Sequence, residues 1–135
     1  LITCVTRRIV EHLEPLVKQI ETEGGVVHAF GSDARDEQAV STLFSHIEAE
    51  IAPIEVVVFN IGANVRFNVV DTTERVYRKV WEMGALAGFL VGREAARAML
   101  PRGRGRPSIA GRRRAADEPD KIEGGDSGVD HGVLT

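Results

Sequence analysis

Cysteine is almost absent from this sequence, and so are the marks of a membrane protein. The 135 residues include a single cysteine, Cys4, so no disulfide can form within the chain. No apolar run approaches the roughly 20 residues that a membrane-spanning helix needs, and no signal peptide is visible. These observations favour a reducing compartment, and they predict a cytoplasmic protein without a membrane partner.

Metal-binding patterns and a strong charge bias are also missing. The four histidines are scattered and one cysteine completes no zinc motif, so we predict no metal site. The formal net charge of −3 gives no overall attraction to nucleic acid or to an anionic membrane. A chain of 135 residues with 43% hydrophobic content is sufficient for one globular domain with a core.

Strand-like and helix-like stretches alternate over the first hundred residues. Short apolar runs predict three strands, at 2–5, 26–30 and 56–59. Apolar residues at helical spacing predict three helices, over 9–23, 37–51 and 74–100. Pro15 would kink the first helix, so an alternative start near Glu14 stays open. This order predicts an α/β fold with a parallel sheet flanked by helices.

Two of these helices carry start signals. Asp36 is predicted to cap the helix over 37–51, and Asp71 or Thr72 the helix over 74–100. In the latter helix Trp81 and Phe89 widen the apolar stripe, and a helix that is apolar on more than one side usually packs on two surfaces. We expect these surfaces to be its own sheet and a partner subunit, which makes a homo-oligomer one prediction.

In their combined order these stretches resemble the short-chain dehydrogenase/reductase family. The resemblance runs from Ile2 to Gly105, and the stretch EGGVVHAFGSDARDEQAVSTLFSHIEAEIAPIEVVVFNIGANVRF and the end of the long helix, GREAARAMLPRGRG, carry it. Each motif alone is weak, whereas their order is fairly specific. Members have a Rossmann-type fold and move a hydride between a nicotinamide cofactor and a carbonyl or alcohol. The resemblance implies an incomplete Rossmann-type dinucleotide-binding domain over 1–105, with NADP or NAD as cofactor.

Two loops carry most of the cofactor residues that the resemblance implies. Asp33-Ala34 matches a family step in which the carboxylate accepts from the adenine amino group and the next backbone amide meets the ring. A turn or capping role for Asp33 is the alternative. Asn60-Ile61-Gly62 resembles the end of the Asn-Asn-Ala-Gly motif, in which Asn60 would stabilise the sheet and Gly62 would admit the ribose. Ile61 stands where the family has alanine and narrows the space in which the ribose approaches the backbone. The alternative is an ordinary turn after the strand, with Asn and Gly as turn-forming residues.

Thr6-Arg7 lies where the family selects its cofactor. An acidic residue there would hold the ribose hydroxyls of NAD, whereas a basic residue suits the additional phosphate of NADP. No acid is present and Arg7 follows Thr6, so the resemblance implies NADP. A solvated surface arginine is an equally open interpretation.

The catalytic parts of the family pattern are missing from this sequence. No Gly-rich loop of the form Thr-Gly-x-x-x-Gly-x-Gly precedes the first strand, where it would hold the pyrophosphate. Gly84 stands where many members carry a proton-relaying Asn. The single tyrosine, Tyr77, lacks a lysine four positions later and comes too early for the family's Tyr-x-x-x-Lys pair. We therefore predict no catalytic residue, and a fragment that is inactive alone.

The sequence changes character after Gly105. Residues 106–135 start with an arginine-rich run and continue as an acidic, Gly-rich segment with few large apolar residues, so we predict a disordered, low-complexity tail. The loss of resemblance here raises the hypothesis of a truncated or frameshifted gene. Nucleic-acid binding by the arginines is the weakest alternative, because no aromatic residue lies among them to stack on bases.

The family's strand order predicts a gap in the sheet. In the order 3-2-1-4-5-6, strand 1 bridges strands 2 and 4, and this chain would hold strands 2, 3 and 4 only. We expect two unpaired edges facing a gap, unless these strands pair directly, and hence marginal stability. Three functions stay open: a truncated oxidoreductase, a non-catalytic dimerisation module and a nucleic-acid binder.

Overall fold

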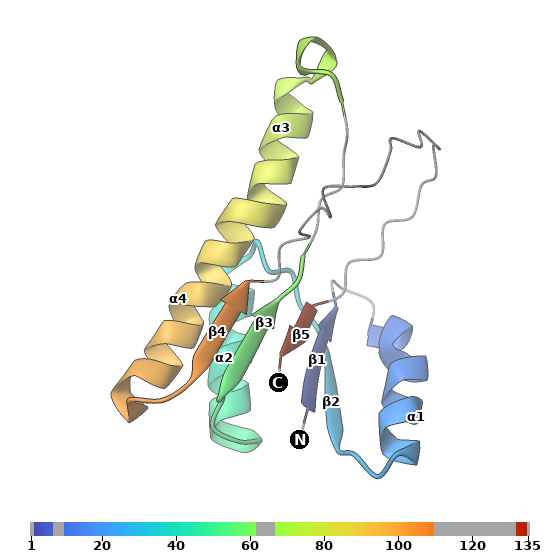
Figure 1. Ribbon diagram of the computed structural model, residues 1–135, viewed down its shortest axis with the longest axis vertical. Coiled ribbons are helices and arrows are strands. Elements are labelled where there is room, and N and C mark those ends of the chain that lie inside the picture. Colours follow the sequence, from blue (N-terminus) through green and yellow to red (C-terminus); the bar gives the residue numbers. More distant parts are fainter. Residues whose placement is uncertain (1, 7–9, 62–66, 110–131, 135) are drawn as a thin grey trace, which may run out of the picture.

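The computed structural model describes residues 2–6, 10–61, 67–109 and 132–134 of the chain. Five strands form one sheet in the order β2-β1-β5-β3-β4 (Figure 1). Their bounds are β1 Ile2–Thr6, β2 Val27–Gly31, β3 Val56–Phe59, β4 Arg106–Ile109 and β5 Gly132–Leu134. The pairs β1–β2 and β3–β4 are parallel, whereas β5 is antiparallel to both β1 and β3. The carboxyl ends of β1 to β4 therefore share one edge of the sheet.

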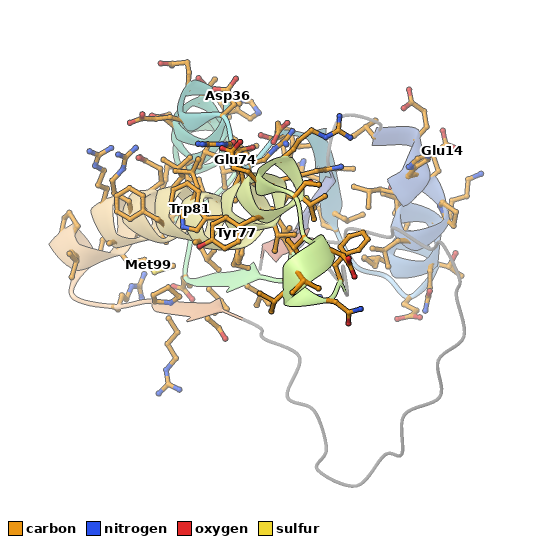
Figure 2. All side chains as sticks on the ribbon, turned by 90° about the horizontal axis from the view of Figure 1, so that it is seen from above. Glu14, Asp36, Glu74, Tyr77, Trp81 and Met99 are labelled. Atoms are coloured by element: carbon orange, nitrogen blue, oxygen red, sulfur yellow. The ribbon has the colours of Figure 1, made fainter. Side chains whose placement is uncertain are left out.

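Helices cover both faces of this sheet, with α1 on one face and α2 and α4 on the other (Figures 1 and 2). The α-helices are α1 Glu14–Thr22, α2 Glu37–Glu50, α3 Glu74–Trp81 and α4 Ala87–Met99. A π-helical turn, Glu82–Leu86, joins α3 to α4, and three 3-10 turns span Val10–Leu13, Val69–Asp71 and Leu100–Arg102. The α/β architecture predicted from the alternating pattern is confirmed.

The main core lies between the sheet and the helices α2 and α4. Its buried residues are Val40, Phe44 and Ile47 of α2, Val57 and Phe59 of β3, Ala87, Val91, Ala95 and Met99 of α4, and Ile54. Helix α4 approaches β3 closely, since a Cβ added at Gly88 would lie 3.3 Å from the ring of Phe59. The buried Val-Val-Val-Phe strand is thus the centre around which two helices are packed.

The observed helix starts follow the sequence, but one predicted capping residue differs. Helix α1 begins at Glu14, the alternative that Pro15 had left open, because proline is tolerated in a first turn. Asp36 caps α2, and its Oδ1 accepts the N–H groups of Gln38 and Ala39 at 2.9 and 3.1 Å. The cap predicted for the third helix was wrong.

Thr73, and neither Asp71 nor Thr72, caps α3. The Thr73 hydroxyl accepts the N–H of Val76 at 3.4 Å. Asp71 instead ends the 3-10 turn, and the Thr72 hydroxyl donates to the carbonyl of Asn68 at 2.9 Å. The extra turn at Val69–Asp71 uses the two expected capping groups, so Thr73 caps the helix, which begins at Glu74 as predicted.

Two short strands lie beyond the predicted boundary at Gly105. Strand β4 follows it directly and pairs with β3 from Val56↔Arg106 to Phe59↔Ile109. Strand β5, near the end of the chain, fills the predicted gap between β1 and β3. Composition could not exclude these strands, because sheet pairing uses backbone groups and not particular side chains. Residues 110–131, including the arginine run 112–114, lie outside the described residues.

Candidate functional site

The residues predicted to meet a cofactor follow strands whose carboxyl ends share one edge. Thr6 ends β1 and pairs with Gly31, the last residue of β2, so the loop containing Asp33 starts beside Thr6. Asn60 follows Phe59 at the end of β3. Ligands of open α/β sheets bind outside the carboxyl ends of the strands. The structure thus brings Thr6, Asp33 and Asn60 to the edge at which such a site forms.

Ala34 and Ile61 anchor the two loops to the same core. Both are partly buried and pack against the cluster between the sheet, α2 and α4. We expected Ile61 to narrow the space in which the cofactor ribose approaches the backbone. In the structure its side chain also packs against the core. Asn60 is exposed beside it, whereas Arg7 and Gly62 lie outside the described residues.

Arg35 fixes the carboxylate of Asp33 at this edge. Its Nε donates to Asp33 Oδ1 at 2.9 Å and its Nη2 to Oδ2 at 2.6 Å, a bidentate pair. The backbone N–H of Arg35 also donates to Oδ1 at 3.1 Å, and the N–H of Asp36 donates to the Asp33 carbonyl at 2.9 Å. Asp33 thus stabilises the turn, which is the alternative role given for it above. The bidentate pair also keeps its carboxylate in one orientation.

Ser32, which precedes Asp33 in the chain, has a hydroxyl without a hydrogen-bond partner among the described residues. Its Oγ is buried, and within the described part of the chain nothing bonds to it. Buried hydroxyls nearly always have a partner, from the protein, water or a ligand. The Ser32 hydroxyl is therefore an unsatisfied polar group just after the end of β2.

Sequence reasoning missed both Arg35 and Ser32. Arg35 carried a usable signal, because an arginine two positions after an aspartate in a turn can reach back to that carboxylate. Ser32 carried none, since a serine in a turn is commonplace and only the packing around it shows that its hydroxyl is buried.

A charged network holds the start of α2 against α4. Arg93 Nη2 donates to Glu37 Oε1 at 2.7 Å, and Arg93 Nε donates to Glu94 Oε1 at 3.2 Å. Arg97 Nη1 donates to the same oxygen of the buried Glu94 at 2.7 Å. The hydrogen bond that Arg93 donates to Glu37, followed by weaker effects of Glu94, raises the pKa of Arg93. Because Glu37 directly follows the cap Asp36, this network also positions the 33–36 turn.

The helical segment from α3 to α4 is interrupted by a π-helical turn at Gly84, the position at which many family members carry Asn. Gly84 lies in the π-helical turn Glu82–Leu86, and such turns occur frequently at functional sites. A Cβ added at Gly84 would meet no atom within 4 Å, so a larger side chain would fit there. Tyr77 lies one helix earlier, in α3, and is 66% exposed.

The described residues contain neither a metal-binding cluster nor a membrane-spanning helix. Within 2–6, 10–61, 67–109 and 132–134, no three His, Cys, Asp or Glu residues lie together in a way that could hold a metal ion. In the same part of the chain, no helix is long and apolar enough to cross a membrane.

Comparison with known proteins places the chain in a family. The model of the short chain dehydrogenase family matches residues 2–110. A gluconate 5-dehydrogenase from Gluconobacter oxydans is 29% identical over 99 residues, and the short chain dehydrogenase/reductase nsrJ from Aspergillus novofumigatus is 30% identical over 94 residues. These alignments cover 73% and 70% of this chain. The chain belongs to the short-chain dehydrogenase/reductase family.

Solved structures agree with this assignment. A short-chain dehydrogenase from Rhodopseudomonas palustris superposes with a TM-score of 0.74 and 48% identity, covering 79% of this chain and 50% of that one. A gluconate 5-dehydrogenase from Burkholderia cenocepacia, solved in complex with NADP and tartrate, has the same fold, with a TM-score of 0.70 and 20% identity over 79% of this chain and 42% of that one. The chain spans only 39% and 36% of the two curated relatives named above.

Proposed function

We propose that this chain binds the adenosine part of NADP or NAD, as the nucleotide-binding portion of a short-chain dehydrogenase/reductase. One observation carries the proposal: Asp33 and Asn60 lie on a common sheet edge, with their neighbours Ala34 and Ile61 packed on one core. Membership of the family and the fold shared with an NADP-bound dehydrogenase support it.

Each residue of the edge has a role suited to its chemistry. The carboxylate of Asp33, oriented by Arg35, would accept a hydrogen bond from the adenine amino group, while the N–H of Ala34 would meet the ring. The hydroxyl of Ser32 would gain a partner from the ligand. Asn60 would hold the end of β3 in place, and Gly62 would let the ribose approach.

The preference between the two cofactors is proposed from the end of β1. Thr6 ends the strand, no acidic residue replaces it, and Arg7 follows. A guanidinium suits the 2′-phosphate of NADP, whereas an acid would suit the free ribose hydroxyls of NAD. NADP is therefore the proposed cofactor, with NAD the weaker ligand.

Binding without turnover is the proposed behaviour of these 135 residues alone. The sequence contains no Tyr-x-x-x-Lys pair and no glycine-rich phosphate loop. A cofactor held only through its adenosine half has no group here to donate or accept the substrate proton. The chain contains one cysteine, and we propose the cytoplasm, a reducing compartment, as its location.

Calorimetric titration with NADPH, NADH, 2′,5′-ADP and nicotinamide mononucleotide tests this proposal. We expect heat from the first three ligands and none from the mononucleotide, because only the adenosine side is recognised. The variant Asp33→Asn should bind 2′,5′-ADP about 10-fold to 100-fold more weakly, the range for losing a hydrogen bond to a charged group. No binding of any adenosine ligand would contradict the proposal.

Asp36→Asn is the matched control for that variant. Asp36 lies in the same turn, but its carboxylate caps α2 and accepts N–H groups of Gln38 and Ala39. Asparagine caps helices about as well as aspartate, so this variant should fold and bind like the parent chain. Equal weakening by both substitutions would show that the turn, and not the Asp33 carboxylate, matters for binding.

A second candidate function is self-association through the long helix. Tyr77, Trp81 and Phe89 are 66%, 49% and 60% exposed, and with the exposed Ala85 they recur every four residues along α3 and α4. Figure 2 shows Tyr77 and Trp81 side by side on the outer surface of the helix. No residue of α3 is buried. We propose a second copy of the chain as the partner, because a helix with such an apolar stripe is stabilised by packing.

A further inference from the structure

Strand β5 occupies a position unlike that of any other described strand. It lies in the middle of the sheet, between β1 and β3, and runs antiparallel to both neighbours, whereas the pairs β1–β2 and β3–β4 are parallel (Figure 1). It has three residues, fewer than either neighbour. The slot between β1 and β3 therefore accepts an extended segment that comes from the far end of the chain.

The pairing of β5 is short on both sides. It reaches Thr3, Cys4 and Val5 of β1, and only Val57 and Val58 of β3. The outer residues of the two neighbouring strands, Ile2, Thr6, Val56 and Phe59, lie beyond this register. Because strand pairing of β5 with β1 and β3 uses backbone groups, an identical segment from another molecule would pair in the same way.

The connection to β5 is much longer than a path within one molecule requires. Gly132 lies opposite Val5, and Ile109 at the end of β4 lies opposite Phe59, so the chain leaves and rejoins the sheet at the same edge. Between β4 and β5 there are two strand spacings, or about 10 Å. The intervening residues 110–131 can span about 70 Å when extended. Such a length lets β5 reach the sheet of a second molecule.

We propose that the slot between β1 and β3 is a strand-acceptor site, and that β5 of a second copy of this chain occupies it when the copies are concentrated. Exchange of an identical strand between two molecules creates no new kind of contact. The protein concentration therefore sets the ratio of β5 paired between molecules to β5 paired within one molecule. Residues 110–131 connect β4 to β5, and a connection of this kind gives an effective concentration on the order of 1 mM. Within one molecule β5 dominates below that concentration, and exchange between molecules increases as the protein approaches it.

The single cysteine supplies the probe for this exchange. Cys4 is directly opposite Val133 in the antiparallel pair, and opposed residues of such a pair have Cβ atoms about 4.5–5.5 Å apart, close to the range of a disulfide. In a Val133→Cys variant of the full chain, mild oxidation should link Cys4 to the introduced thiol. Below about 0.1 mM the link should lie within one chain, and near the effective concentration of about 1 mM a fraction on the order of one half should join two chains.

A mixture of ¹⁴N-labelled and ¹⁵N-labelled chains of this variant identifies the linked copies by mass spectrometry. Peptides joining Cys4 of one label to the introduced thiol of the other are the expected result. Two control variants show whether the link is specific. Leu134→Cys lies opposite Thr3 and should not crosslink to Cys4, and Cys4→Ser/Val133→Cys should give no crosslink at position 4. Links within one chain at every concentration would overturn the exchange, and the absence of any link between Cys4 and the introduced thiol would overturn the acceptor site itself.

If Val133→Cys fails to fold, strand exchange can be tested by NMR on the unsubstituted chain. Chains labelled with ¹⁵N are mixed at about 1 mM with chains labelled with ¹³C, the concentration at which exchange is expected. Filtered NMR spectra should then show contacts between β5 of one label and β1 of the other. These contacts should vanish on tenfold dilution and re-equilibration. If the concentrated mixture shows none, β5 stays with its own sheet and the proposal is wrong.

Discussion

Glu48 and Arg102 form a hydrogen-bonded ion pair across 54 residues of sequence, with Arg102 Nη1 donating to Glu48 Oε2 at 2.6 Å. The other carboxylate oxygen, Oε1, accepts the N–H of Ile54 at 2.7 Å, and Arg102 Nη2 donates to the carbonyl of Ile54. One carboxylate and one guanidinium thus tie the end of α2, the start of β3 and the turn after α4. The core that carries the edge with the candidate site is closed at its opposite end by this pair.

Arg102→Gln should lower the free energy of unfolding by about 1.5–3 kcal/mol, because Glu48 and the Ile54 carbonyl both lose a charged donor. Arg104→Gln is the control. Arg104 is 67% exposed and pairs with Glu55 at 3.3 Å, and exposed pairs contribute about 0–1 kcal/mol. Urea denaturation of both variants measures the difference. Similar losses for the two arginines would show that Arg102 does not hold these elements together.

Gly105→Ala should be destabilising because both the backbone and the space around it require glycine. Gly105 has φ +132°, and an added Cβ would lie 2.5 Å from Cγ and Sδ of Met99, a buried core residue. Overpacking of this kind costs about 1–3 kcal/mol, and the backbone strain adds to it. Gly103→Asn is the matched variant, since Gly103 has φ +64° with nothing within 4 Å, and Asn tolerates that conformation. A thermal melt that is unchanged for Gly105→Ala would contradict the observed turn.

Trp81→Glu should abolish association through the long helix. A carboxylate at the centre of the stripe would be buried without a partner in any interface that Tyr77, Trp81 and Phe89 form. Val26→Glu is the control, because Val26 is 59% exposed and lies before β2, away from this helix. Sedimentation velocity should show the parent chain and the control associating and Trp81→Glu as a monomer. If all three sediment alike, the stripe is not an interface.

The Arg93 bridge between α4 and α2 should be insensitive to pH over the ordinary range. Because the pKa of Arg93 is raised in the folded chain, its contribution to stability is complete below the usual arginine pKa and is lost only as the pH rises through the still higher folded value. The stability difference between the parent chain and Arg93→Met should therefore stay constant from about pH 7 to about pH 10. A difference that disappears within this window would mean that another group controls the bridge.

Sequence patterns predicted those elements whose side chains repeat over several residues. Val56–Phe59 and the helix capped by Asp36 were expected at nearly their observed bounds, because an apolar run and a cap with helical spacing are local signals. Strand β5, Gly132–Leu134, gave no such signal, since three residues are too few for a pattern. Its place in the sheet depends on the free edges of β1 and β3, which are distant in the chain.

The sequence predicted which residues lie at the edge with the candidate site, but it did not predict the contacts that their side chains make. Placing Asp33 and Asn60 together required only the rule that parallel strands end at one edge. The bidentate pair between Asp33 and Arg35 depends on the shape of a four-residue turn. The π-helical turn at Gly84 depends on how α3 and α4 join, and neither feature has a side-chain period that a sequence reveals.

The central claim is that the edge formed by Thr6, Asp33 and Asn60 holds an adenosine nucleotide, and NMR mapping of the full chain tests it most directly. Titration with 2′,5′-ADP into ¹⁵N-labelled protein should shift the amide signals of Ser32, Asp33 and Ala34, and those of Asn60 and Ile61, while the signals of α1 stay unchanged. The same titration of Asp33→Asn should need about tenfold more ligand. Shifts confined to α1 or to the long helix, or no shifts at all, would contradict the account.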